Sequence, residues 1–480
     1  METPEESPSG AADEVEKDAV AGPPQSDARE DRELDGVLAR RDIGVVFQPV
    51  VDLRSREVVG LEALARGPHG TALANPAALF AAARRTGRVA ELDWVCRAAA
   101  FEAVVRAGLP PSMSLFLNVE PEAFAVACPP DLLAAVTRAE SMLRVFVEVN
   151  DRALATDPAG LLAAVDRART SGWGVALDDV GASRDSMAVM PVIGADVIKL
   201  DLRLLRQRSP QDASAITMSV LAHAELTGAA LLVEGIESED DAEWARAVGA
   251  AYGQGYHIGV PGRLADHYPV PRATVPLGLA GSDEPAAGSP FAMVADLPAR
   301  AVDRAHVDEL AQLVYRTALV PGASPVILAC GGPDDRPQAE RGVGYPALET
   351  EPLLAVLFGE DLPPLPIPDT PDLRGVRVPR GDPLVDESFL VVLCEKGPFA
   401  LVGWSAPSTV GAPVEVVLTQ DPDVVHRIAR HLMRRLPPPG ADNDALPPPG
   451  PSDLDDAVES TDTSGDRARS GWRGRLGRRP

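Results

Sequence analysis

Residues 174–201 read GVALDDVGASRDSMAVMPVIGADVIKLD and hold two short apolar runs that each end on acidic residues, at Asp178–Asp179 and at Asp201. Three further runs follow the same pattern: FLNVE at 116–120, VFVEV at 145–149 and LLVEG at 231–235. If these runs are parallel strands of one barrel, the residues at their C-terminal ends converge on one face. The pattern therefore predicts a ring of polar side chains at one end of a barrel.

The composition of this ring suits a divalent cation. Its members are Asn118, Glu148, Asp178, Asp179, Asp201 and Glu234. Carboxylate and amide oxygens are the ligands that hard divalent cations prefer. Lys199 lies within the same ring, in a chain whose other lysines are Lys17 and Lys396 and which otherwise uses arginine. A compact ammonium at this position suggests a role that a guanidinium cannot fill.

Composition excludes several classes of protein. The 480-residue chain is 45% hydrophobic and has a formal net charge of -26. No apolar run approaches the roughly 18 to 20 residues that cross a membrane, and the acidic N-terminus does not resemble a signal peptide. We expect a soluble, cytoplasmic protein without general affinity for duplex DNA. A small phosphorylated ligand stays possible, because metal ions invert the local charge of an acidic cleft.

The four cysteines are scattered without the spacing of a zinc site or a disulfide framework, and we expect buried free thiols. They are Cys96, Cys128, Cys330 and Cys394.

Alternating strand and helix patterns divide the chain into two folded units. Residues 35–265 predict an α/β domain, a TIM-like (β/α)8 barrel, with an open doubly wound sheet as the alternative. The absence of a GxGxxG or GxxxxGK[ST] motif at a helix start disfavours that alternative. Residues 1–34 are polar and acidic, and 437–480 are rich in proline and end in a basic run; both predict disorder. Residues 266–292 predict a linker or a wrapped connection.

Residues 293–436 predict a smaller α/β or α+β domain. A helix is expected over 302–317, followed by strands at 325–330, 388–394, 399–404 and 414–419. A closing helix is expected after Asp421, which can cap it, with Pro422 at its first position.

Residues 46–67, VFQPVVDLRSREVVGLEALARG, predict two strands joined by a polar turn. Glu62-Ala63-Leu64 followed by Arg66, with Gln48-Pro49 before it, resembles the EAL family of cyclic di-GMP phosphodiesterases. The resemblance continues in order through LFLNVEPEAF, FVEVND, VALDDVGAS, DVIKLD, LLVEGIES and AYGQGYHIGVP, with ELDWVCRAAA in a connecting helix. It covers about half the chain.

This resemblance implies metal-dependent hydrolysis of cyclic di-GMP to linear pGpG at a two-metal site holding Mg²⁺ or Mn²⁺. The implied metal ligands are Glu62, Asn118, Glu148, Asp178, Asp179 and Glu234. The implied catalytic residues are Lys199, Glu234 and Asp179. The implied substrate-binding residues are Gln48, Glu62, Leu64, Arg66, Asp201 and Gln254. A homodimer through the barrel is a further expectation.

Two segments depart from the family pattern. The family usually has Phe-Gly-Thr-Gly after the aspartate pair, where this chain has Val180-Gly181-Ala182-Ser183. The family's Glu-Leu-Thr-Glu corresponds to Glu148-Val149-Asn150-Asp151, so the last acid is one methylene shorter. Because both changes affect groups that support the ligands, an alternative function is a weak or inactive effector that binds cyclic di-GMP. The run SEDDAEW at 238–244 is different and predicts an acidic helix start.

The second domain resembles, more weakly, the DICT sensory domain. The resemblance rests on a segment around Arg341 and Tyr345, on DPLVDESFLVVLCEKGPFALVGW, and on VVLTQDPDVVHRIARHLMRRL. It implies that an unknown signal or protein binds there and regulates the barrel. A structural or dimerising domain without a ligand is the alternative.

Overall fold

The structure is a computed structural model that describes residues 25–124, 126–150, 152–181, 185–278, 288–318, 324–331, 352–360, 373–394, 396–404 and 413–437. The expectations for Lys17, Asp151, residues 182–184, Arg341, Tyr345 and the tail beyond 437 lie outside these residues.

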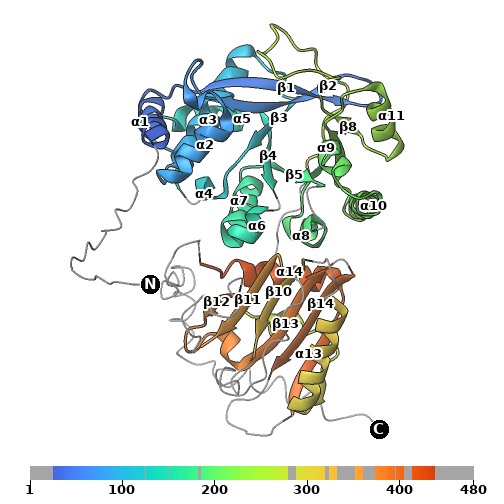
Figure 1. Cartoon of the computed structure of the whole chain (residues 1–480). Coiled ribbons are helices and arrows are strands. Elements are labelled where there is room, and N and C mark those ends of the chain that lie inside the picture. The colour runs from blue at the N-terminus through green and yellow to red at the C-terminus, as the bar shows by residue number, and fades with distance from the viewer. Residues whose placement is uncertain are drawn as a thin grey trace, which may run out of the picture.

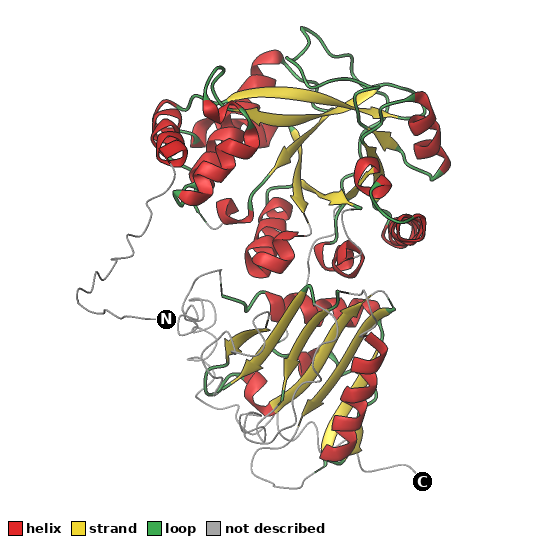
Figure 2. Ribbon diagram, in the orientation of Figure 1, coloured by secondary structure: helices red, strands yellow, loops and turns green. Residues whose placement is uncertain are grey.

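Eight strands close into a barrel in sequence order, which confirms the predicted TIM-like α/β fold (Figures 1 and 2). The strands are β1 (Gly44–Asp52), β2 (Val58–Arg66), β3 (Ser114–Asn118), β4 (Arg144–Asn150), β5 (Gly174–Val180), β6 (Val197–Asp201), β7 (Ala230–Glu234) and β8 (Tyr252–Gly253). β1 is antiparallel to β2 and to β8, so the two strands predicted over residues 46–67 form a hairpin. The short polar turn after β1 causes this reversal, because it leaves no room for a crossover helix.

Helices surround the barrel. They are α2 (Pro76–Arg85), α3 (Val89–Ala107), α4 (Pro121–Phe124), α5 (Leu133–Met142), α6 (Arg152–Thr156), α7 (Pro158–Thr170), α8 (Asp185–Ile193), α9 (Leu202–Arg206), α10 (Pro210–Thr227) and α11 (Glu239–Ala247), with a 3-10 turn at Ala72–Ala74. Ser238 accepts from the Asp241 N–H, and the Asp241 carboxylate accepts from the Ser238 N–H. The predicted acidic start of α11 is thereby confirmed as a capping box.

The acidic N-terminal tail is shorter than predicted, because α1 spans Gln25–Arg40. The expectation of disorder is wrong for residues 25–34. Leu34, Val37 and Leu38 are fully buried, and this apolar stripe offsets the entropy of ordering an otherwise polar helix.

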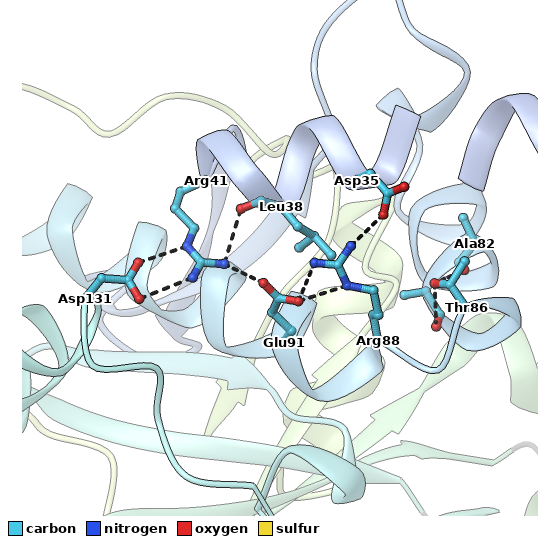
Figure 3. Close-up of polar contacts among 9 residues, drawn as sticks. Asp35, Leu38, Arg41, Ala82, Thr86, Arg88, Glu91 and Asp131 are labelled. Atoms are coloured by element: carbon cyan, nitrogen blue, oxygen red, sulfur yellow. Dashed lines mark hydrogen bonds and ion pairs between the residues drawn. The ribbon is translucent and has the colours of Figure 1, made fainter. Parts of the chain in front are cut away.

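Ion pairs add to this attachment of α1, as Figure 3 shows. Arg88 donates to Asp35 at 2.7 Å and to Glu91 at 2.6 Å, while Arg41 contacts Glu91 at 2.8 Å and Asp131 at 3.0 Å. Exposed ion pairs of this kind each contribute roughly 0 to 1 kcal/mol, so the apolar stripe is the larger contribution.

Part of the predicted linker closes the N-terminal end of the barrel. Val275 is fully buried among interior residues such as Phe116 and Phe146. The Val275 carbonyl accepts from the Arg144 guanidinium at 2.5 Å, and the Gly278 N–H donates to Asp196 at 2.8 Å. This part of 266–292 is therefore a wrapped connection, the second of the two expectations.

The second domain is a seven-stranded sheet in the order β12-β11-β10-β13-β14-β15-β9. The strands are β9 (Arg300–Val302), β10 (Val326–Cys330), β11 (Leu354–Gly359), β12 (Leu373–Arg377), β13 (Glu387–Cys394), β14 (Gly397–Trp404) and β15 (Val414–Thr419). The helices are α12 (Pro290–Met293), α13 (Arg304–Ala318) and α14 (Pro422–Met433), with a 3-10 turn at Pro383–Asp386. As predicted, Asp421 caps α14 and Pro422 begins it. The strands β9, β11 and β12 were not predicted.

Helices cover both faces of this sheet. α13 packs on β13 and β14 from one side, and α14 lies on the other side, facing the barrel (Figure 1). Within the described part of the chain, no helix has the length and apolarity to cross a membrane. All four cysteines are free; Cys330 and Cys394 are buried, while Cys96 and Cys128 are partly buried.

The two domains share an interface that centres on α14. The Arg430 guanidinium donates to the carbonyls of Pro191 at 2.8 Å and Val192 at 2.7 Å, at the end of α8. Arg434 forms an ion pair with Asp166 of α7 at 3.1 Å. The apolar residues of α8 and α14 belong to one continuous core. The second domain is therefore docked on the barrel helices α7 and α8.

We predict that Arg430→Met increases the rate of backbone hydrogen exchange in α8. Hydrogen bonds from a charged donor contribute about 1.5 to 3 kcal/mol, and their loss frees the end of this helix. Arg435→Met is a matched control, because Arg435 pairs with Asp382 inside the second domain at 2.9 Å. Equal α8 exchange in the two variants, measured by mass spectrometry, would contradict the docking role of Arg430.

Candidate active site

Each of the eight barrel strands brings one polar residue to the same end of the barrel. They are Gln48 of β1, Glu62 of β2, Asn118 of β3, Glu148 of β4, Asp178 of β5, Lys199 of β6, Glu234 of β7 and Gln254, directly after β8. Register pairs such as Gln48 with Glu62 and Asn118 with Glu148 place neighbours at one level. The convergence that the strand-end pattern predicted is thus present, and Gln48 and Gln254 complete the ring.

Lys199 lies at the centre of this ring and is 1% exposed. Its Nζ is 2.5 Å from Glu148 Oε1, 2.8 Å from Glu234 Oε1, 3.1 Å from Asp178 Oδ1 and 3.8 Å from Glu62 Oε2. Burial lowers the pKa of Lys199, but the charges of the four carboxylates outweigh burial and hold the pKa well above its usual value. Lys199 is therefore a permanent cation in this site.

The carboxylates of the ring outnumber their cation. Four acids against one ammonium leave three uncompensated negative charges when all are ionised. Burial, followed by the charge of Glu62, raises the pKa of Glu148 well above its usual value, although Lys199 opposes this shift. Burial and the neighbouring carboxylates likewise raise the pKa of Glu234 to about 8. The ring therefore favours any further positive charge, whether a proton or a metal ion.

Amide side chains hold the carboxylates in place. Asn118 Nδ2 donates to Glu62 Oε1 at 3.3 Å and to Glu148 Oε2 at 3.0 Å. Gln254 Nε2 donates to Gln48 Oε1 at 3.1 Å and also to Glu62, while Gln48 Nε2 donates to the Gly259 carbonyl at 3.1 Å. These bonds orient the carboxylates of Glu62 and Glu148 beside Lys199.

The aspartate pair lies at an irregularity of β5. The register with β6 shifts between Leu177 and Val180, and Asp179 has a left-handed backbone with φ of 58°. Such a conformation is uncommon for a residue other than glycine, although aspartate tolerates it better than most. Strain of about 1 to 3 kcal/mol is typical of such positions at functional sites. The irregularity lets Asp178 reach Lys199 while Asp179 follows directly behind it.

Three of the expected substrate-binding residues lie further from the centre of the ring. Asp201 is 1% exposed and accepts from the N–H groups of Arg203 and Leu204, so that it caps α9. Arg66 is half-buried, and its Nη1 donates to the Ala65 carbonyl at 2.8 Å. Leu64 is half-buried next to it. Their roles stay predictions.

Asp93 of α3 supports the site and was not predicted. Its Oδ1 accepts from the Glu120 N–H at 3.1 Å, two residues after Asn118, and its Oδ2 lies 2.7 Å from Arg97 Nε. Asp93 and Arg97 are 1% and 2% exposed. The signal in the sequence was an aspartate and an arginine four positions apart on an otherwise apolar helix.

The donor set fits divalent cations in its chemistry. In the described part of the chain, no three side chains of His, Cys, Asp or Glu are arranged so that they could hold a metal ion. The Lys199 ammonium occupies the centre of the ring instead. The ring nevertheless offers only oxygen donors with excess negative charge. Glu148 Oε1 and Asp178 Oδ1 are buried and face the Lys199 ammonium, at 2.5 Å and 3.1 Å. One cation shared by several carboxylates leaves oxygen lone pairs that suit a hard divalent cation.

Comparison with known proteins gives one family and several relatives. The model of the EAL domain matches residues 31–261. The chain is 27% identical over 230 residues to the probable cyclic di-GMP phosphodiesterase PdeB of Escherichia coli, covering 46% of this chain and 43% of that protein. It is 28% identical over 222 residues to the cyclic di-GMP phosphodiesterase RocR of Pseudomonas aeruginosa, covering 45% and 56%. An uncharacterized protein of Sinorhizobium fredii is 30% identical over 233 residues, covering 47% and 27%.

Among solved structures, the manganese and cyclic di-GMP complex of BlrP1 from Klebsiella pneumoniae is 26% identical with a TM-score of 0.40, covering 46% of this chain and 56% of that chain. The matches to PdeB, RocR and the Sinorhizobium protein span at most 56% of those proteins. The match to the family model nevertheless coincides with the barrel and with every residue of its polar ring. This chain therefore carries an EAL domain, which occupies residues 31–261.

Proposed function

We propose that the EAL domain hydrolyses cyclic di-GMP to linear pGpG with divalent cations, under control of the second domain. The observation that carries the proposal is the ring of four carboxylates around buried Lys199. The curated relatives PdeB and RocR are named as cyclic di-GMP phosphodiesterases, which supports the same substrate.

The metal ligands in this proposal are Glu62, Asn118, Glu148, Asp178, Asp179 and Glu234. Bound Mg²⁺ or Mn²⁺ would supply the Lewis acidity that makes water a nucleophile and neutralises a phosphodiester. The ligands would bring the cations to the end of the barrel where Lys199 already compensates part of the negative charge.

Lys199 has the principal catalytic role among the residues of the chain. As a permanent cation it donates hydrogen bonds to the attacking water and offsets charge that develops on the phosphoryl oxygens. Glu234, whose Oε1 lies 2.8 Å from Lys199 Nζ, is the second member of the catalytic set. Asp179 completes the catalytic set. Attack of water on phosphorus breaks one P–O bond, and the released 3′ oxygen takes up a proton.

The proposed substrate contacts lie around the ring. Arg66 can form a bidentate contact with a phosphate, and Gln48 and Gln254 can donate to phosphate oxygens or to water. Leu64 offers an apolar contact beside Arg66, while Glu62 and Asp201 lie at the strand ends below the substrate.

The route for regulation runs through α8. This helix follows the strand that carries Asp178 and Asp179, and Arg430 of the second domain binds the carbonyls at its other end. A signal that moves α14 would therefore move α8.

The rate of cyclic di-GMP hydrolysis tests this route in the two variants Arg430→Met and Arg435→Met. A different rate in Arg430→Met would support the route, and equal rates would contradict it. The DICT resemblance of the second domain and a homodimer through the barrel stay predictions.

The alternative function is binding of cyclic di-GMP without efficient hydrolysis. Val180-Gly181 replaces the usual start of the loop behind the aspartate pair, and Asp179 has a strained backbone there. A shift of about 1 Å in a catalytic group can cost on the order of 100-fold in rate.

We expect the full chain to hydrolyse cyclic di-GMP. Purified full chain with Mn²⁺ and cyclic di-GMP is expected to release pGpG, resolved by chromatography, whereas Glu62→Ala is expected to release none. Circular dichroism checks that the variant is folded. Calorimetric binding in Ca²⁺ without any product would favour the effector, and absence of binding would refute both functions.

Lys199→Arg is expected to lower kcat by about 100-fold and to change affinity for cyclic di-GMP only slightly. The planar guanidinium keeps the charge but cannot occupy a position within 3.8 Å of four carboxylates at once. Lys396→Arg, in the second domain, is the matched control and should retain full turnover. An unchanged kcat for Lys199→Arg would remove Lys199 from the mechanism.

Stability of the metal-free protein is expected to fall as pH rises from 4.5 toward 8. The folded-state pKa of Glu234 is about 8 against an ordinary 4.5, so the folded state holds this proton more tightly than the unfolded state. Mg²⁺ would replace that proton, so its stabilisation at one fixed Mg²⁺ concentration should be larger at pH 8.5 than at pH 6. Thermal unfolding of wild type and Glu234→Gln tests this prediction; an Mg²⁺ effect that is independent of pH in wild type would contradict it.

A further inference from the structure

Arg203 lies at the edge of the candidate active site, in the first turn of α9 directly after β6. Its Nη2 donates to Asp201 Oδ2 at 2.8 Å, and its Nε lies 3.4 Å from Asp201 Oδ1. The Asp201 carboxylate also accepts from the Arg203 N–H at 2.6 Å and from the Leu204 N–H at 3.4 Å. Both oxygens of Asp201 are thus engaged within its own segment. Asp201 is 1% exposed, whereas the Arg203 side chain is 63% exposed.

The Arg203 side chain also borders the acidic ring. It passes over Gly235, where an added Cβ would lie 3.1 Å from Arg203 Cγ. Gly235 follows Glu234, and Glu234 is paired in register with Asp201. The hydrogen bond to Asp201, and further the charges of Asp201 and Glu234, raise the pKa of Arg203. Arg203 is therefore a fixed cation within electrostatic reach of the ring.

Lys199 is not available to a substrate phosphate, because it is buried and already contacts four carboxylates. Among the described residues, Arg66 ends β2 and Arg203 follows β6, four strands away in a closed barrel of eight. The two residues therefore lie on opposite sides of the barrel mouth. Neither Arg66 nor the Nη1 of Arg203 contacts a further acid among the described residues.

Two cations on opposite sides of the barrel mouth suit a ligand that carries two negative charges. A cyclic dinucleotide has two phosphodiester groups, of which one is hydrolysed while the other must be bound elsewhere. We propose that Arg203, anchored by Asp201, binds the phosphate that is not hydrolysed. This inference rests on the proposed function, and it gives Asp201 the role of a positioning residue that acts through Arg203.

Arg203→Met tests the contact. Loss of one charge-assisted hydrogen-bonding group at an exposed site should raise KM, and the Kd measured by calorimetry in Ca²⁺, by about tenfold. The kcat should stay within about threefold, because the reacting phosphate is held by the ring. Arg203→Lys should recover part of the affinity. Arg206→Met is the matched control, since Arg206 lies on the same helix, is 55% exposed and pairs with Asp241 instead.

The outcomes separate this inference from the proposed function. Wild type that binds cyclic di-GMP and an Arg203→Met variant with the same Kd would overturn the inference alone. A variant that loses kcat with KM unchanged would show a structural effect on the ring, and would overturn it too. Wild type that neither binds nor cleaves cyclic di-GMP would overturn the proposed function and the inference with it.

Discussion

The ion-pair cluster around Lys199 is the interaction on which the site depends. A buried ammonium is costly unless charged partners surround it, and here Glu62, Glu148, Asp178 and Glu234 do so from four different strands. These acids in turn repel one another, and Lys199 relieves only part of that repulsion. The strands that carry them must therefore be held rigidly, while the site keeps a high affinity for further cations. Both properties suit an enzyme that handles an anionic substrate with metal ions.

The rest of the barrel supplies that rigidity. Asn118 and Gln254 orient the carboxylates of Glu62 and Glu148, and Asp93 holds the segment after Asn118 against α3. At the other end, Val275 fills the barrel interior beneath the stacked rings of Phe116 and Phe146. The strand β5 is irregular at the aspartate pair, and it leads into the helix that the second domain binds. The strained segment of the site is thus connected through α8 to the second domain.

Several features could be predicted because they depend on residues close together in the chain. The apolar runs ending in acids, the acidic start of α11, the capping residue Asp421, and the strands of the second domain's centre are of this kind. Other features were missed for identifiable reasons. The apolar stripe of Leu34, Val37 and Leu38 is hidden in an acidic segment, and β11 and β12 are separated by long stretches without a regular pattern. Val275 looked like part of a linker because a single buried residue has no periodicity.

The sequence by itself determined which chemical groups this site contains: four carboxylates, three amides and one lysine at successive strand ends. It also determined the alternation of strands and helices that makes a barrel. Only the tertiary structure decided which oxygens face Lys199 and that Arg430 binds the end of α8. These contacts join residues tens to hundreds of positions apart, such as Arg430 and Val192. Their distances follow from strand register and helix packing, which local composition does not encode.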